Sequence, residues 1–220
     1  MNQVRPRVAV ADMGSGNLRS VEKALTRAGA DVVVTSDAVA VSRADKVVVP
    51  GQGHFGACMA GLGREGGALR EAILEAVRAG KPYLGICLGL QVLFESSEEV
   101  PGCPGLGLLP GTVRRFPTGD PALKVPHMGW NRTTRPGERA PGGVGGAAPA
   151  ALARVPDGTF FYFVHSYFPV PARPEDVALE CDHGVRFCAA VARDNIFASQ
   201  FHPEKSQDAG AALLSAFIAA

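Results

Sequence analysis

Residues 83–91 read Tyr-Leu-Gly-Ile-Cys-Leu-Gly-Leu-Gln, an apolar run in which two glycines flank a cysteine. Tyr83–Ile86 is typical of a buried strand, and Leu88–Glu95 has the pattern of a helix. A Gly-x-nucleophile-x-Gly sequence at a strand-to-helix junction is typical of a strained turn, the nucleophile elbow. The stretch therefore predicts a strand that feeds directly into a helix, with Cys87 at the turn between them.

Strand-like runs and helical patterns alternate on the N-terminal side of this elbow. A helix is expected to begin at Leu18, behind the candidate N-cap Asn17, and to stop at Gly29; another covers Gly67–Ala79. Continuously apolar strands that alternate with helices indicate a parallel sheet covered on both faces. The strand-like runs before the elbow are Arg7–Asp12, Asp31–Thr35 and Lys46–Val49.

The second half of the chain contains shorter β-rich runs and one final helix, Asp208–Ala220. Turn residues at Asp157-Gly158 and Asp182-His183-Gly184 separate some of the runs. We therefore expect an α/β protein with an open mixed, mainly parallel sheet flanked by helices, in one domain of residues 1–220. The β-rich runs are Gly111–Arg115, Met128–Thr133, Thr159–Val164, Val177–Cys181, Phe187–Val191 and Ile196–Gln200.

Residues 135–153 differ in composition, because Gly, Ala and Pro dominate them. Such a segment buries little apolar surface, so the sequence predicts a flexible surface loop there.

Composition limits the kinds of function that fit the chain. Of 220 residues, 46% are hydrophobic and 20% charged, which excludes a disordered chain. A net charge of +1 gives no electrostatic footprint for nucleic acid or an anionic membrane surface. No run is long enough to span a bilayer, and the first residues lack a signal-peptide pattern. Five cysteines at irregular spacing argue against a disulfide framework, so we expect a cytoplasmic protein with reduced thiols.

The elbow predicts nucleophilic chemistry at Cys87. A helix N-terminus favours a thiolate, and the backbone N–H of Leu88 is then available to an oxyanion. A thiolate nucleophile needs a base and a group that orients the base. His202-Pro203-Glu204 supplies both if His202 and Glu204 point the same way from an extended segment. The alternatives are a buried structural Cys87 and an incidental surface His202.

Pro50-Gly51-Gln52-Gly53 is the candidate for the second oxyanion donor. It follows the third predicted strand, at the carboxyl edge where open α/β sheets bind ligands. Glycines there allow a backbone N–H to turn toward a substrate, although a simple tight turn fits this segment equally well.

Two further patterns carry less weight. The segment 12–17, Asp-Met-Gly-Ser-Gly-Asn, resembles a dinucleotide fingerprint but lacks the third glycine. Cys181, His183 and Cys188 do not have the spacing of a zinc site, so we expect no metal site. These two cysteines, with Cys58 and Cys103, are interpreted as structural.

Six segments together resemble the class I (triad-type) glutamine amidotransferases, and the resemblance covers nearly the whole chain outside 135–153. PHMGWN, YFVHSY and GSGNLRSV are most similar to the members that serve histidine biosynthesis. The resemblance implies the flavodoxin-like fold of that family and no cofactor. The segments are MGSGNLRSV, VVVPGQGHFGACM, GICLGLQVLFESSEE, PHMGWN, YFVHSYF and SQFHPEKSQ.

The resemblance implies a glutaminase. Cys87 would attack the glutamine carboxamide and form a thioester, His202 would move the proton, and Glu204 would orient His202. The oxyanion hole would come from Leu88 and the turn of Gly51, Gln52 and Gly53. The glutamine-binding residues would be Gly53, Gln91, Glu99, His165, Ser166 and Tyr167.

The resemblance also implies a partner. Ammonia would pass to a separate (β/α)8-barrel cyclase subunit, which binds the chain in a heterodimer. The candidate interface residues are Met13, Gly14, Ser15, Gly16, Asn17, Trp130 and Tyr162, although Tyr162 equally fits the core. In the family the oxyanion peptide is misaligned until the partner's substrate binds. This chain departs from the family pattern within that peptide, because Gln52 stands where the pattern more often has Val.

Three other functions compete with this one. Another amidotransferase subunit, such as that of anthranilate or aminodeoxychorismate synthesis, shares the triad but should lack PHMGWN and GSGNLRSV. A peptidase or redox-stress protein with a Cys elbow gives no reason for Gln91 and Glu99. A non-catalytic binding module gives no reason to keep Cys87, His202 and Glu204 together.

Overall fold

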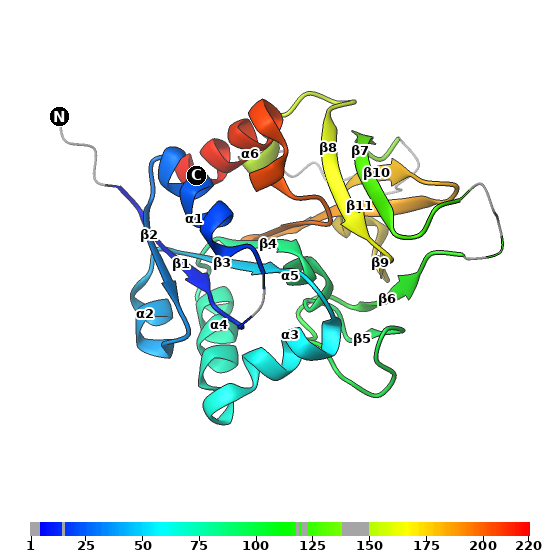
Figure 1. Ribbon diagram of the computed structural model, residues 1–220. Helices are drawn as coiled ribbons and strands as arrows, with labels where there is room; N and C mark the ends of the chain where they lie inside the picture. Colours follow the sequence, from blue (N-terminus) through cyan, green and yellow to red (C-terminus); the bar gives the residue numbers. More distant parts are fainter. Residues whose placement is uncertain (1–4, 15, 118, 120–122, 138–149) are drawn as a thin grey trace.

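The computed structural model describes residues 5–14, 16–117, 119, 123–137 and 150–220. These residues form a nine-stranded mixed sheet in the strand order β2-β1-β3-β4-β12-β11-β10-β7-β8 (Figure 1). A second sheet has the order β5-β6-β9. The strands are β1 Arg7–Ala11, β2 Asp31–Thr35, β3 Lys46–Gly51, β4 Tyr83–Cys87, β5 Ser96–Ser97, β6 Gly111–Arg115, β7 His127–Thr134, β8 Phe160–His165, β9 Tyr167–Pro171, β10 Val177–Asp182, β11 Arg186–Arg193 and β12 Ile196–Ser199.

The large sheet is parallel from β2 to β12 and antiparallel from there to β8. Apart from Arg7 and Lys46 at their first positions, strands β1, β3 and β4 carry no charged residue and are buried, as expected for parallel strands covered on both faces. The predicted mixed, mainly parallel α/β sheet is therefore confirmed.

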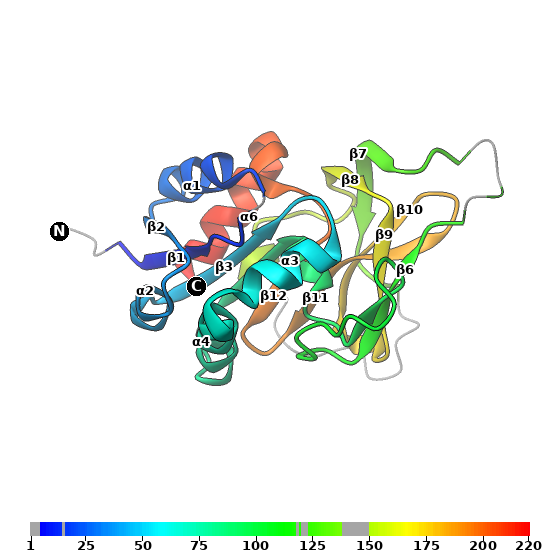
Figure 2. The same cartoon turned by 60° about the horizontal axis from the view of Figure 1, so that its bottom comes forward.

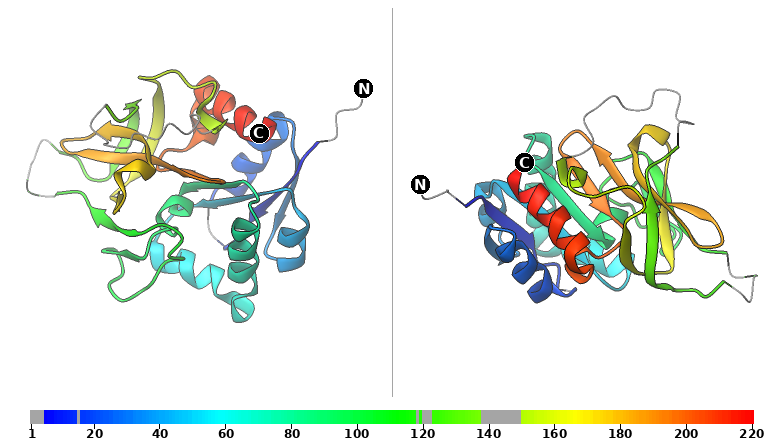
Figure 3. Two further views of the ribbon diagram at one scale, coloured as in Figure 1. Left: turned by 180° about the vertical axis from the view of Figure 1, so that it is seen from behind. Right: turned by 90° about the horizontal axis from the view of Figure 1, so that it is seen from above.

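Helices cover both faces of the parallel half. The side chains of α1 and α6 pack into one hydrophobic cluster, and those of α2, α3 and α4 pack into the other. Figure 2 shows the sheet between the two layers, and the two views of Figure 3 show α6 lying along one face. The helices are α1 Leu18–Arg27, α2 Ala38–Arg43, α3 Phe55–Leu62, α4 Ala68–Arg78, α5 Leu88–Gln91 and α6 Gln207–Ala219.

The parallel arrangement brings three strand ends to one edge. β3 ends at Gly51, which pairs with Cys87 at the end of β4, and β12 ends at Ser199 opposite Ile86. Segments 50–53, 87–91 and 200–204 therefore meet at the carboxyl edge, where the sequence predicted chemistry.

Several local predictions need correction. The helix after the elbow is α5, only four residues long, because the chain turns after Gln91 and buries Val92, Leu93 and Phe94 in the core. Asn17 occupies the N-cap position of α1 but its side chain makes no capping hydrogen bond. Helices α2 and α3 and strands β5 and β9 were not predicted.

The predicted Gly/Ala/Pro loop is also corrected in part. Residues 138–149 of it lie outside the described residues. At its end, however, Ala150–Leu152 forms a short 3-10 helix, and Ala151 and Leu152 are buried in the cluster that contains α1 and α6. This end of the segment contributes to the core rather than to the surface.

Within the described residues, no helix combines the length and apolar character needed to cross a membrane.

Candidate active site

Cys87 lies on a strained turn between β4 and α5. Its φ of 55° and ψ of −102° are rare for a residue with a side chain, as expected at a nucleophile elbow. A Cβ on Gly85 would lie 2.5 Å from the carbonyl oxygen of Gly89, and one on Gly89 would overlap the carbonyl oxygen of Val49. Gly85 is therefore required by close packing within the elbow, and Gly89 by close packing of the elbow against β3.

His202 and Glu204 meet behind the elbow. His202 Nδ1 lies 2.8 Å from Glu204 Oε1, and both side chains are almost fully buried. The predicted contact is present, but the predicted extended segment is wrong, because Pro203–Lys205 forms a 3-10 turn. The backbone N–H of His202 donates to the carbonyl of Tyr162, and Ser206 Oγ donates to the carbonyl of His202. Hydrogen bonds therefore fix the backbone of His202 on both sides, and Glu204 fixes its imidazole ring.

The environment of His202 favours its protonated form. Burial lowers the pKa of the imidazole, but hydrogen bonding and attraction from Cys87 and Glu204 outweigh it and raise the pKa to about 9. Nε2, the nitrogen not bonded to Glu204, is buried without a hydrogen bond of regular geometry. This nitrogen is therefore available for proton transfer with Cys87.

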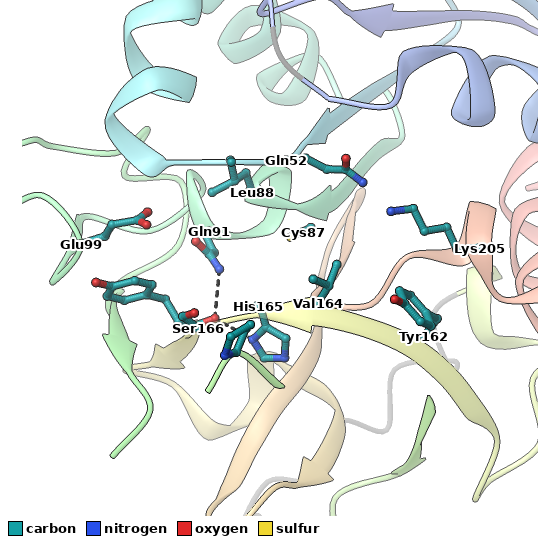
Figure 4. Close-up of a pocket in the computed structure, with 13 residues that line it drawn as sticks. Gln52, Cys87, Leu88, Gln91, Glu99, Tyr162, Val164, His165, Ser166 and Lys205 are labelled. Carbon is teal, nitrogen blue, oxygen red and sulfur yellow. Dashed lines mark hydrogen bonds between the residues drawn. The ribbon is translucent and has the colours of Figure 1, made fainter. Parts of the chain in front are cut away.

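The Gly51–Gly53 turn lies beside the elbow. A Cβ on Gly51 would lie 2.5 Å from Leu88 Cβ, so only glycine allows this approach. Gly53 has a φ of 109°, which a residue with a side chain rarely adopts. Gln52 Nε2 is buried without a partner. Figure 4 shows the side chains of Gln52 and Lys205 pointing toward one another from opposite sides of the cavity.

A cavity of about 420 Å³ opens over Cys87. Glu99 reaches it with a carboxylate whose Oε2 accepts from the N–H of Phe55, at 2.7 Å. Gln91 Nε2 donates to the carbonyl of Tyr167, at 3.1 Å (Figure 4). Among the residues that line the cavity are Gln52, Gly53, Cys87, Leu88, Gln91, Glu99, His165, Ser166 and Tyr167, which are all sequence-predicted site residues.

A buried histidine pair supports the wall of this cavity. His165 Nδ1 lies 2.8 Å from the carbonyl of Tyr167, and His165 Nε2 lies 3.0 Å from His127 Nδ1. Burial lowers the pKa of His165 to about 3 and that of His127 to about 4. Both rings are therefore neutral near pH 7, and each can donate one hydrogen bond and accept another.

Sequence reasoning missed Gln200, which is fully buried directly after β12. Its Oε1 accepts from Gln91 Nε2 at 3.1 Å, and its Nε2 lies 3.5 Å from Cys87 Sγ. The only sequence indication was its position two residues before His202, at the carboxyl end of a predicted strand.

The candidate interface residues differ in how exposed they are. Trp130 is 47% exposed, and its ring lies edge-on to that of Tyr162, which also lines the cavity. Met13 is 1% exposed and contacts Cys58, so its side chain lies in the core rather than on the surface. Gly14 and Gly16 are exposed and Asn17 is half-buried, whereas Ser15 lies outside the described residues.

The remaining cysteines have structural surroundings. Burial raises the pKa of Cys58 and of Cys181 to about 12 and raises that of Cys188 further. Asp182-His183-Gly184 forms the turn between β10 and β11, as predicted. No metal-binding group of three His, Cys, Asp or Glu residues occurs in the described ranges.

Comparison with protein families finds one match over nearly the whole chain. The family described as "Glutamine amidotransferase class-I" matches residues 9–220. Among curated proteins, "Imidazole glycerol phosphate synthase subunit HisH" of Aromatoleum aromaticum is 50% identical, with 96% of this chain and 97% of the relative covered. The protein of the same description from Methanothermobacter thermautotrophicus is 47% identical, with the same coverage.

Solved structures share the fold at low sequence identity. PurLQS from Thermotoga maritima superposes with a TM-score of 0.71 at 19% identity and covers 98% of both chains. The glutaminase domain of CTPS from Trypanosoma brucei gives a TM-score of 0.65 at 17% identity and covers 97% of this chain and 92% of that chain.

Proposed function

Because the chain belongs to the class I glutamine amidotransferase family, we propose that it is the glutaminase subunit of imidazole glycerol phosphate synthase. It hydrolyses glutamine to glutamate and ammonia and delivers the ammonia to a cyclase subunit. The 45–50% identity to subunits of that name, over 96% of the chain, supports the assignment.

In the first half of the reaction, Cys87 and His202 cleave the carboxamide. The sulfur of Cys87 attacks the side-chain carbonyl carbon of glutamine and forms a C–S bond, while the carbonyl oxygen becomes an oxyanion. His202 Nε2 gives the proton that it took from the thiol to the amide nitrogen. The C–N bond then breaks, ammonia leaves, and a γ-glutamyl thioester remains on Cys87.

In the second half, water replaces ammonia. It attacks the thioester carbonyl and gives a proton to His202, the C–S bond breaks, and glutamate leaves as the thiolate forms again. Glu204 orients the ring in both halves and stabilises its cationic form, a role supported by the 2.8 Å contact.

We assign the oxyanion hole to the backbone N–H of Leu88 and one backbone N–H of the Gly51–Gly53 turn. A missing donor at such a site costs about 3–4 kcal/mol, or about 10²–10³ in rate. We therefore propose that the turn is misaligned in the isolated subunit and is aligned when the partner binds its nucleotide substrate. The φ of 109° at Gly53 supports a turn whose backbone N–H groups can change direction, because glycine alone adopts such conformations readily.

Glutamine would lie in the cavity over Cys87. Gln91 and Glu99 hold its α-amino and α-carboxylate end, together with backbone groups of Gly53 and of the segment 165–167. This placement is supported by their position around one cavity of about 420 Å³.

The partner would be the cyclase subunit HisF, a (β/α)8 barrel, in a heterodimer. There, ammonia would convert a phosphoribulosyl-formimino-aminoimidazole carboxamide ribonucleotide into imidazole glycerol phosphate and AICAR. Exposed apolar side chains on β7 and β8 support a docking face beside the cavity: Met128 is 63%, Trp130 47% and Phe160 53% exposed. The proposed compartment is the cytoplasm, which five unpaired cysteines support.

The observation that carries the proposal is that Cys87, which lines the cavity, raises the pKa of His202, whose buried ring contacts Glu204. A glutamine-analogue affinity label tests it. We expect selective alkylation of Cys87 that glutamine prevents, and loss of glutamate release in Cys87→Ala. Labelling that glutamine does not prevent would instead favour a peptidase or redox-stress protein.

A further inference from the structure

We propose that Gln200 is a further residue of the catalytic centre, whose amide nitrogen stabilises the thiolate of Cys87 while its amide oxygen holds Gln91 in the glutamine site. The part of the inference that treats Gln91 as a glutamine-binding residue rests on the proposed function. The contact with sulfur depends on geometry alone, with 3.5 Å between Gln200 Nε2 and Cys87 Sγ.

The orientation of both amides follows from one backbone carbonyl. The carbonyl of Tyr167 can only accept, so the Gln91 atom 3.1 Å from it must be the nitrogen. That nitrogen also lies 3.1 Å from the Gln200 side chain, so the Gln200 atom facing it must be the oxygen. The nitrogen of Gln200 is therefore the atom that faces Cys87.

The same carbonyl is fixed from its other side by the histidine pair. Asn131 Nδ2 donates to the carbonyl of Asp182 and lies 3.1 Å from His127 Nε2, so that ring nitrogen accepts. His127 Nδ1 then donates to His165 Nε2, and His165 Nδ1 donates to the carbonyl of Tyr167. Because each hydrogen bond determines the next, the amide of Gln200 cannot turn over without leaving two donors face to face.

A donor aimed at sulfur favours the thiolate over the thiol, because the hydrogen bond is stronger to the charged form. Gln200 is fully buried, and its backbone N–H donates to the carbonyl of Ala189, so the side chain has little freedom to leave this position. Its position also links the nucleophile to the substrate site, because one amide contacts both Cys87 and Gln91.

The test is the pH dependence of Cys87 alkylation by iodoacetamide, followed by mass spectrometry of the Cys87 peptide. The measurement needs neither glutamine nor the partner, so it is independent of the proposed function. In Gln200→Glu the oxygen that holds Gln91 stays and the donor is lost. We expect alkylation at pH 7.5 to slow about 10- to 100-fold, as for loss of a hydrogen bond to a charged group, and its pH midpoint to rise. Gln200→Met, of similar volume and uncharged, should give the same direction of change.

Asn195→Asp is the matched control. Asn195 lies at the other end of β12 and donates to the carbonyls of Val77 and Lys81, so this variant loses stability without touching the sulfur. Its alkylation profile should match that of the wild type. A wild-type profile in Gln200→Met, with the variant folded by circular dichroism, would overturn the proposal. So would an equal change in Asn195→Asp.

Discussion

Replacing Glu204 by Gln tests how much of the chemistry depends on the charge behind His202. The rise of the His202 pKa from 6.5 to about 9 corresponds to about 3 kcal/mol in favour of the imidazolium. Glu204 supplies one of the two hydrogen bonds and one of the two attractions behind this rise. The amide oxygen of the introduced glutamine can still accept from Nδ1, so the substitution removes the charge and keeps the contact. We expect kcat/KM for glutamine to fall by about 20- to 200-fold in the complete complex.

The pH profile separates this cause from a structural one. A proton on His202 is needed when ammonia leaves, so the wild-type rate should fall as pH rises through about 9. In Glu204→Gln this alkaline fall should move to lower pH. Asp208→Asn, which removes an exposed carboxylate on α6, should change neither quantity. A folded Glu204→Gln variant with a kcat/KM within about threefold of wild type and an unmoved profile would refute the reasoning.

Three further outcomes are expected. Gly89→Ala forces a methyl group into the carbonyl of Val49, so urea denaturation should give a loss of about 1–3 kcal/mol in the free energy of unfolding; an unchanged midpoint would contradict the packing at the elbow. Because the pKa values of His127 and His165 are low in the folded chain, the unfolded chain binds their protons first as pH falls below 6.5. The free energy of unfolding should therefore decrease between pH 6.5 and 4, by about 2 kcal/mol per histidine at pH 5. Equal urea midpoints at pH 7.5 and 5 would contradict the neutral state of the two rings. Trp130→Ala should weaken binding of the cyclase subunit by about 2 kcal/mol or more in calorimetry without changing Cys87 alkylation; unchanged affinity would exclude Trp130 as an anchor.

Much of the parallel half of the fold could be predicted from the sequence. Its strands are short apolar runs, and the elbow glycines mark the junction of β4 with α5, where packing permits only glycine. The helix predicted over Leu88–Glu95 was too long, because the spacing of apolar residues does not distinguish a continuing helix from buried turns such as Val92–Phe94.

The antiparallel half and the deeper part of the site were less predictable. The orientation of the Gln200 amide depends on Gln91, Tyr167 and Cys87, which are all distant from Gln200 in the chain and meet it only in the folded protein. Burial of Met13 likewise depends on a tertiary contact, the packing of α3 against the loop after β1, where Gly61 leaves room for it.

The most direct test of the central claim is glutamate release from glutamine, with the cyclase subunit and its nucleotide substrate added together, singly or not at all. The proposed function predicts weak release from the chain alone and stimulation of about 10²–10³-fold in the full mixture, the size of a completed oxyanion hole. Full activity of the isolated chain, with no response to the cyclase and its nucleotide, would contradict it.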